Sequence, residues 1–202
     1  MCLIIKKPAG RRICNAFLTN AWQHNCDGWG SFFLEAGQPM WAKGMRLVDL
    51  LRHNDALPES GEVFLHLRKA TYGHVTQDMA HPYLVNDWGD GRRMLLMHNG
   101  SIDHLAPEDP SLSDTAMLAR LLRDMLSGLS ADQGAALVRS EGFARLTAPL
   151  LQGSMVVLFD HRGARRLGRE WLAVQNDQWH AGMAGIEVSN TRTWLRDAAQ
   201  AA

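Results

Sequence analysis

The sequence opens with MCLIIK over residues 1–6, and residues 2–6 predict a buried β-strand that carries Cys2 at its first position. Removal of Met1, which a small second residue favours, would give Cys2 a free α-amine beside its thiol. Such amines titrate near pH ~8 and thiols near pH ~8.5, so a proton can pass between them near neutrality. One residue would then hold a nucleophile and its base. On its own, a cysteine at this position is more simply a coincidence, so its role depends on the rest of the chain.

Outward from this strand, the hydrophobic pattern predicts further strands and a few helices. Leucines and valine at helical spacing predict a helix over residues 46–53. Ser113 is a predicted N-cap for a helix that Gly128 stops, and Ser130 with Gln133 forms a predicted capping box for a second helix that ends near Gly142. The predicted strands are 31–35, 38–42, 63–67, 94–98, 154–159, 171–174 and 183–188. Because no regular alternation of strand and helix is present, the order favours an α+β fold over a doubly wound parallel sheet.

Composition narrows the function classes. The 202 residues include 21 basic and 21 acidic side chains, a balance that argues against a nucleic-acid partner. The basic run at 162–169 is more simply a solvated turn and strand face than a binding patch. We expect one domain over residues 1–202, in the cytoplasm and without a membrane partner, because neither an export signal nor a long apolar stretch is visible. The odd count of cysteines, Cys2, Cys14 and Cys26, also fits a reducing compartment.

Four short segments could carry chemistry: NCDGWG at 25–30, HLRKATYG at 66–73, HNGSI at 98–102 and SDT at 113–115. Each has a structural interpretation when it is taken alone. An Asp-Gly or Asn-Gly pair is most often a turn, and Ser-Asp-Thr before an amphipathic run is an ordinary helix start. Alternate residues of a strand, such as His66 and Arg68, can simply share a solvated face.

Their combination and order resemble the class II glutamine amidotransferases, a family of amino-terminal-nucleophile hydrolases. The ordered matches are Cys2, Asp27-Gly28, His66–Thr71, His81-Pro82, Asn99-Gly100 and Ser113–Thr115. The resemblance covers residues 1 to about 126 well, and beyond that it is limited to 154–163 and 183–190. It implies a four-layer αββα sandwich of two mostly antiparallel sheets.

The resemblance also implies catalytic roles. Cys2 would attack the side-chain amide carbon of glutamine and form a thioester, while its α-amine moves the proton from the thiol to the leaving ammonia. The side-chain amide of Asn99 and the backbone N–H of Gly100 would form the oxyanion hole.

Four further residues are substrate-binding candidates by the same resemblance. Arg68 would bind the α-carboxylate of glutamine, where its planar fork suits two oxygens, and Asp114 would bind the α-ammonium. Thr71 would line the carboxylate end, and His81 would organise the pocket. Among the nine histidines, His66, His74, His81 and His98 have no zinc-site spacing and no clustered carboxylates, so we expect no metal and no cofactor.

Three functions remain open. In the first, the chain is a stand-alone glutaminase that supplies ammonia to a separate synthetase or amide ligase, since its length leaves no room for an acceptor domain. In the second, it is an amidohydrolase that cleaves a γ-glutamyl amide with a larger leaving amine. In the third, it is a catalytically silent binding module of the same fold.

Overall fold

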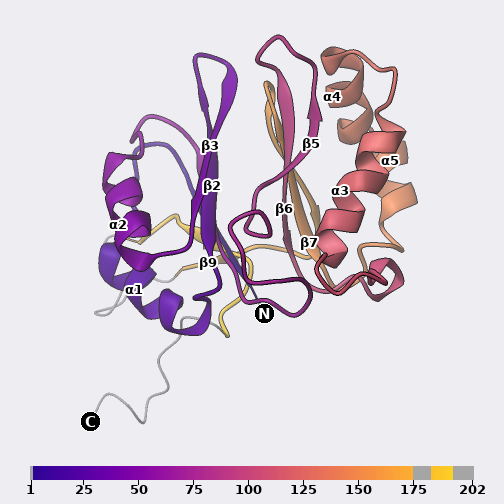
Figure 1. The fold of residues 1–202 in the computed structure, drawn as a ribbon. Coiled ribbons are helices and arrows are strands. Elements are labelled where there is room, and N and C mark those ends of the chain that lie inside the picture. Colours follow the sequence, from indigo (N-terminus) through magenta and orange to yellow (C-terminus); the bar gives the residue numbers. More distant parts are fainter. Residues whose placement is uncertain (1, 175–182, 193–202) are drawn as a thin grey trace.

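The computed structural model describes residues 2–174 and 183–192, and these form two stacked antiparallel sheets with helices on both outer faces (Figure 1). The six-stranded sheet has the order β3 (Gln38–Gly44), β2 (Trp29–Glu35), β4 (Val63–Leu67), β1 (Leu3–Lys7), β10 (Glu187–Val188), β9 (Leu172–Ala173). The four-stranded sheet has the order β5 (Tyr83–Asp87), β6 (Arg93–Asn99), β7 (Met155–Asp160), β8 (Gly163–Gly168). The predicted four-layer αββα sandwich of the α+β class is therefore confirmed.

Helices cover the two outer faces of this sandwich. The six-stranded sheet carries α1 (Asn15–His24) and α2 (Leu47–Ala56), and the four-stranded sheet carries α3 (Asp114–Met125), α4 (Ala131–Arg139) and α5 (Glu141–Thr147) (Figure 1). A short 3₁₀ turn, η1 (Asp103–Leu105), precedes α3. None of the helices in the described ranges is long and apolar enough to cross a membrane.

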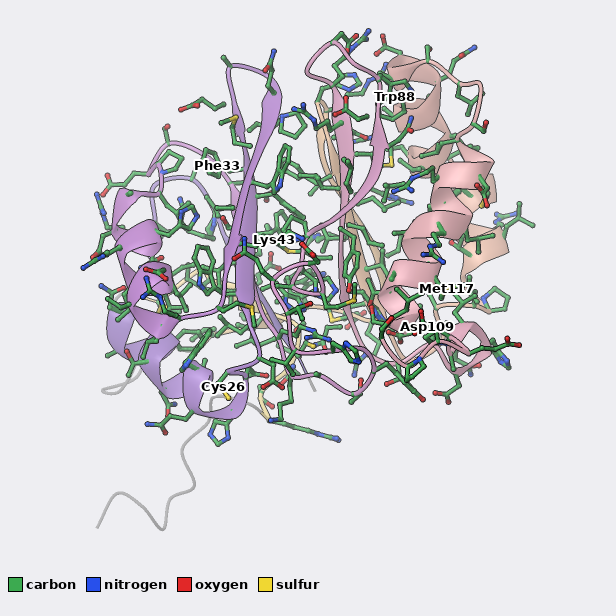
Figure 2. The ribbon with its side chains drawn as sticks, viewed as in Figure 1. Cys26, Phe33, Lys43, Trp88, Asp109 and Met117 are labelled. Atoms are coloured by element: carbon green, nitrogen blue, oxygen red, sulfur yellow. The ribbon has the colours of Figure 1, made fainter. Side chains whose placement is uncertain are left out.

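Three apolar clusters fill the spaces between the four layers, and side chains occupy the space between the sheets in Figure 2. Strand β4 shows how the layers shape the sequence. Phe64 points into the cluster between the sheets, whereas Leu65 and Leu67 point into the cluster under α1 and α2. Because both faces of the strand are buried, its sequence does not alternate between apolar and polar residues, and the buried His66 is its one polar side chain.

The predicted helix starts are confirmed in detail. The Ser113 side chain accepts a hydrogen bond from the Ala116 N–H at 3.1 Å, and Ser130 with Gln133 forms both bonds of a capping box. The second predicted helix is wrong in its extent. It ends at Arg139, where Ser140 has an extended backbone, and the Ser140 side-chain hydroxyl caps α5 by accepting from the Phe143 N–H at 3.1 Å.

Sequence patterns missed α1, β5 and α5, whereas the strand face expected within 162–169 is present as β8. Helix α1 has no side-chain N-cap bond and no acidic residue in its first turn, so local signals for it are weak. Its buried Phe17, Leu18 and Ala21 pack on the six-stranded sheet, which supplies the stability that intrinsic propensity does not. The predicted strands at 171–174 and 183–188 are present as the two-residue β9 and β10, although 175–182 lie outside the described residues.

We predict that Phe159→Ala destabilises the protein by about 3–5 kcal/mol, because it empties the middle of the inter-sheet cluster. Phe159 is 1% exposed, and its ring stacks on Phe32 with centroids 4.4 Å apart. Urea unfolding followed by tryptophan fluorescence measures the change. The control is Leu146→Ala, at a side chain that is 80% exposed, and we expect it to change stability by under about 0.5 kcal/mol. Equal effects of the two substitutions would contradict the prediction.

Candidate active site

Strand pairing places Cys2 beside Arg68. Leu3 of β1 lies opposite Leu67 of β4, so the residues just beyond these two leave the sheet at the same end. The Arg68 N–H donates to the Gly28 carbonyl at 2.8 Å, and the Asp27 N–H donates to the Arg68 carbonyl at 3.0 Å. The Asp-Gly turn therefore extends the sheet edge next to Cys2, and Gly28 adopts a φ of +124° there, a conformation that favours glycine.

The Cys2 thiol is half-buried and contacts the next segment of chain. The Lys69 N–H donates to Sγ, with nitrogen and sulfur 3.4 Å apart, and Nδ2 of Asn190 donates to the Cys2 carbonyl at 2.7 Å. Burial raises the pKa of the Cys2 thiol above its ordinary value, although the Lys69 N–H and nearby positive charge oppose this. The thiol is thus largely protonated near pH 7, and its use as a nucleophile requires a base.

The second wall comes from the end of β6, where Asn99 and Gly100 follow one another. Gly100 adopts a φ of +151°, and a Cβ added there would lie 2.9 Å from the Cα of Ser154. Only glycine fits this position, because Ser154 occupies the space that a side chain would need. The backbone N–H of Gly100 is thereby held at the edge of the site.

Asn99 is fully buried next to Gly100, and its side-chain amide contacts Ser189. Asn99 is not among the described residues that line the pocket at Cys2. Nδ2 lies 2.6 Å from the Ser189 hydroxyl, and Oδ1 has no partner in the described part of the chain. The Ser189 oxygen already accepts from the Ile4 N–H at 2.8 Å, so its own proton needs an acceptor. Rotating the amide by 180° lets Oδ1 accept that proton and leaves the NH₂ group as the free donor.

Helix α3 contributes Asp114 in its first turn. The side chain is 4% exposed, and its two oxygens accept from the N–H groups of Ile102 and Thr115 at 2.8 and 2.7 Å. Arg68 is 3% exposed, and its guanidinium donates to the carbonyls of Tyr72 and His74 at 3.0 and 2.9 Å. Since a guanidinium has five N–H groups, three of them remain for other partners.

Six of the seven predicted site residues line one pocket, and Asn99 is not among the described residues that line it. The six are Cys2, Arg68, Thr71, His81, Gly100 and Asp114. The pocket has a volume of about 20 Å³, which is the space of roughly one or two water molecules. An amino acid could therefore enter only if the side chains or the loop at 69–74 shift.

Three buried histidines lie at this pocket: His81 and His98 line it, and His66 contacts both of them. The rings of His66 and His81 stack with centroids 3.8 Å apart, and His98 is hydrogen-bonded to the hydroxyls of Thr115 and Ser154 at 2.8 and 3.0 Å. Burial lowers the pKa of His66 to about 3, lowers that of His81 well below its usual value, and lowers that of His98 as well. All three rings are therefore neutral near pH 7. Among the described residues, no group of three His, Cys, Asp or Glu side chains is placed to hold a metal ion.

Sequence reasoning missed Ser154, Ser189 and Asn190 as neighbours of the site. Asn190 reaches the Cys2 carbonyl across 188 positions, and Ser189 reaches Asn99 across 90. No motif spacing could reveal these contacts, because they exist only once β10 pairs with β1. The available signal was the predicted strand at 183–188, which ends directly before Ser189.

Two stacked antiparallel sheets with helices on both outer faces form a sandwich of the amino-terminal-nucleophile hydrolase type, and Cys2, Arg68, Asp114 and Gly100 line one pocket in it. The family model of class-II glutamine amidotransferases matches residues 14–126, more than half of the chain. The chain belongs to this family. A search of curated proteins found no match.

Solved structures with a similar fold include "the allosteric regulatory enzyme of purine biosynthesis", with 13% identity over 80% of this chain and a TM-score of 0.50. Glutamine phosphoribosylpyrophosphate amidotransferase from B. subtilis has 15% identity over 80% and a TM-score of 0.47. This chain covers 36% and 35% of those two chains, so it spans about a third of their length. A glutamine aminotransferase class-II domain protein from Silicibacter pomeroyi has 20% identity over 80% of this chain and 73% of its own, with a TM-score of 0.37.

We predict that the free energy of unfolding falls as the pH drops below 6.5, partly through His66. The folded protein holds this ring neutral to about pH 3, whereas the unfolded chain protonates it near 6.5. Unfolding therefore takes up a proton between these values, and each such histidine contributes at most about 1.4 kcal/mol per pH unit. In urea unfolding between pH 7 and 4.5, His66→Gln should have a shallower slope than the wild type. The exposed control His104→Gln should keep the wild-type slope, and equal slopes for wild type and His66→Gln would contradict the prediction.

Proposed function

We propose that Cys2, once Met1 is removed, is the nucleophile of a glutaminase that hydrolyses the side-chain amide of glutamine. The observation that carries this proposal is the single pocket in which the Cys2 thiol meets Arg68, Asp114 and Gly100. The family membership of the chain supports the same reaction class. A reducing cytoplasm suits the activity, because it keeps a thiol nucleophile free.

The raised pKa of the thiol supports the α-amine of Cys2 as the general base. The neutral rings of His66, His81 and His98 have depressed pKa values and are poor acceptors near pH 7. The α-amine takes the thiol proton as sulfur bonds to the amide carbon. It then protonates the nitrogen as the C–N bond breaks, and ammonia leaves. Water hydrolyses the remaining thioester to give glutamate and the free thiol.

The negative oxygen that forms during attack would be held by the Gly100 N–H and by the Asn99 amide in its rotated orientation. The rotated amide satisfies the Ser189 hydroxyl and leaves its NH₂ group without a partner among the described residues. Each such donor typically contributes about 3 kcal/mol to transition-state stabilisation.

Arg68 and Asp114 would recognise the amino-acid end of glutamine. Both charged groups are buried, and a zwitterion offers the α-carboxylate to one and the α-ammonium to the other. A simple amide would leave both buried charges without a substrate partner, which costs several kcal/mol. In this proposal the released ammonia goes to a separate synthetase or amide ligase.

Cys2→Ala should abolish glutamine hydrolysis and leave the fold intact, because the thiol has no structural bond except those to Lys69 in the described part of the chain. Intact mass after exposure to a diazo-ketone glutamine analogue should show one adduct on wild type and none on Cys2→Ala. Cys26→Ala, at an exposed thiol, is the matched control and should react like wild type.

Protein that keeps Met1 should fold normally and show no turnover, because its α-amine is not on Cys2. Absence of an adduct on Met1-free protein would instead support a catalytically silent binding module. Normal turnover by Cys2→Ala would reject the assigned nucleophile.

Arg68→Ala should lower kcat/KM for glutamine by roughly 30- to 150-fold, mainly through KM, since a charge-assisted bidentate contact is worth about 2–3 kcal/mol. Arg46→Ala removes an exposed arginine outside the site and should have little effect. Because Arg68 also binds the carbonyls of Tyr72 and His74, thermal unfolding must be measured in parallel. An unchanged KM in a folded Arg68→Ala protein would contradict the assigned role.

A further inference from the structure

The pocket at Cys2 continues into a larger space on the side away from Arg68 and Asp114. This second cavity, which we call the exit groove, has a volume of about 270 Å³. It shares Cys2, Lys69, Thr71 and Gly100 with the small pocket and is completed by Ser101, Gly153 and Arg169. A glutamyl group held by Arg68 and Asp114 would thus direct the other substituent of its amide into the exit groove.

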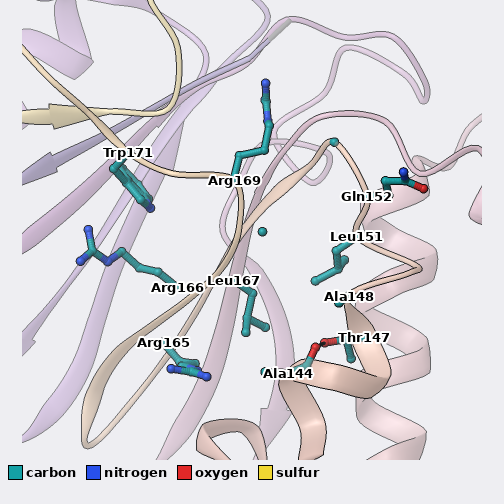
Figure 3. A pocket seen from close by; sticks show the side chains of 12 residues that line it. Ala144, Thr147, Ala148, Leu151, Gln152, Arg165, Arg166, Leu167, Arg169 and Trp171 are labelled. Carbon is teal, nitrogen blue, oxygen red and sulfur yellow. Dashed lines mark hydrogen bonds between the residues drawn. The ribbon is translucent and has the colours of Figure 1, made fainter. Parts of the chain in front are cut away.

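A third cavity, which we call the arginine groove, follows the exit groove and shares Gly153 and Arg169 with it. It has a volume of about 510 Å³ and lies between α5 and the edge strand β8 (Figure 3). Leu167 and Leu151 face each other across it, and Trp171 stands at one side in the same view. Together the two grooves form a path from the Cys2 thiol to an apolar and aromatic surface.

The arginine groove is also positively charged. Arg165, Arg166 and Arg169 line it, and no Asp or Glu is among the described residues that line either groove. Glu187 partly offsets this charge, because it pairs with Arg166 at 3.1 Å. Within the described ranges, Arg165 and Arg169 form no ion pair, and Nε of Arg165 is buried without a hydrogen-bond partner. A buried donor left unpaired is costly, so this groove is set up to receive an acceptor.

Ammonia does not need this space. Hydrolysis of glutamine releases a molecule with a single heavy atom, whereas the two grooves offer about 270 and 510 Å³. We propose that the arginine groove binds the leaving amine of a γ-glutamyl amide, and that this amine carries a carboxylate or another anionic group together with an apolar portion. The anionic group contacts Arg165 and Arg169, and the apolar portion packs on Leu151, Leu167 and Trp171.

This inference rests on the proposed Cys2 chemistry and replaces only the leaving group. Sulfur bonds to the γ-carbonyl carbon, the C–N bond breaks, and the thiol proton passes through the α-amine to the departing amine. Water then cleaves the thioester, so one water is consumed for each glutamate and each anionic amine released. Apart from water, the reaction requires no second substrate and no oxidant.

The test uses a matched pair of substrates, γ-glutamyl-phenylalanine and its neutral C-terminal amide, with Met1-free protein. We expect wild type to prefer the carboxylate form by about tenfold or more in kcat/KM, because one charge-assisted arginine contact corresponds to at least that factor. Arg165→Gln and Arg169→Gln should each lower this ratio several-fold, and the double variant should bring it close to one. Arg162→Gln removes an exposed arginine that does not line the groove, and it should keep the wild-type ratio.

Calorimetric binding of the same two compounds to Cys2→Ala protein separates this proposal from the catalytic one. Tighter binding of the carboxylate form that depends on Arg165 and Arg169 supports the proposed binding site in the arginine groove. If wild type nevertheless hydrolyses neither compound, only the proposed catalytic function is rejected. A wild-type ratio of one, or an unchanged ratio in the folded double variant, overturns the proposal. Binding of poly-glutamate to wild type and to the double variant is measured in parallel. If the double variant loses this binding but keeps the substrate ratio, the proposal is also overturned, and the groove is assigned to an acidic protein surface.

Discussion

Antiparallel pairing of β1 with β4 and β10 is the constraint on which the site depends. It fixes the backbone of Cys2 directly before the first residue of β1, at one end of the sheet. The same pairing brings Ser189 against Ile4 and Asn190 against the Cys2 carbonyl. The backbone of Cys2 and of nearby Ile4 is thus held by side chains from the segment that follows β10, while the Cys2 side chain faces a pocket. This is the preorganisation that a reacting group requires.

The pocket combines strong burial with separated charges. Asp114 and Arg68 are nearly inaccessible, and backbone groups of neighbouring loops already contact both of them. Burial also raises the pKa of the thiol and keeps the nearby histidines neutral. These effects have one cause, the removal of charged forms from water. They make the α-amine of Cys2 the best-matched base for the proposed reaction, and they leave proton transfer independent of the histidine rings.

Beyond the thiol, the surface changes from closed and polar to open, apolar and basic. Arg165 and Leu167 are two positions apart in β8, so they lie on the same face of the strand. Both line the arginine groove, whose opposite wall comes from α5. The basic run that resembles an ordinary solvated strand face in the sequence is therefore part of a cavity wall. This wall lies one cavity away from Cys2. Only a leaving amine much larger than ammonia would reach it, so the size of the leaving group distinguishes a γ-glutamyl amidohydrolase from a glutaminase.

Most of the fold followed from local patterns, and the failures have physical causes. Strands buried on both faces, such as β4 and β7, contain enough apolar residues to be recognised, and Ser113 and Ser130 mark helix starts by their side-chain chemistry. Local sequence signals did not predict helix α1, because tertiary packing, rather than capping or propensity, stabilises it. Ser140 broke a predicted helix because its hydroxyl caps the next one.

The sequence by itself determined the order of the chemical groups: a cysteine at position 2, then Arg68, Asn99-Gly100 and Asp114, each beside a recognisable turn, strand or helix start. Only the tertiary structure decided which of them share a pocket, how the Asn99 amide is held by Ser189, and where the arginines of β8 lie relative to Cys2. These relations depend on pairings between segments far apart in the chain. Local residue preferences encode strands and caps, but they do not encode which strand becomes the neighbour of which.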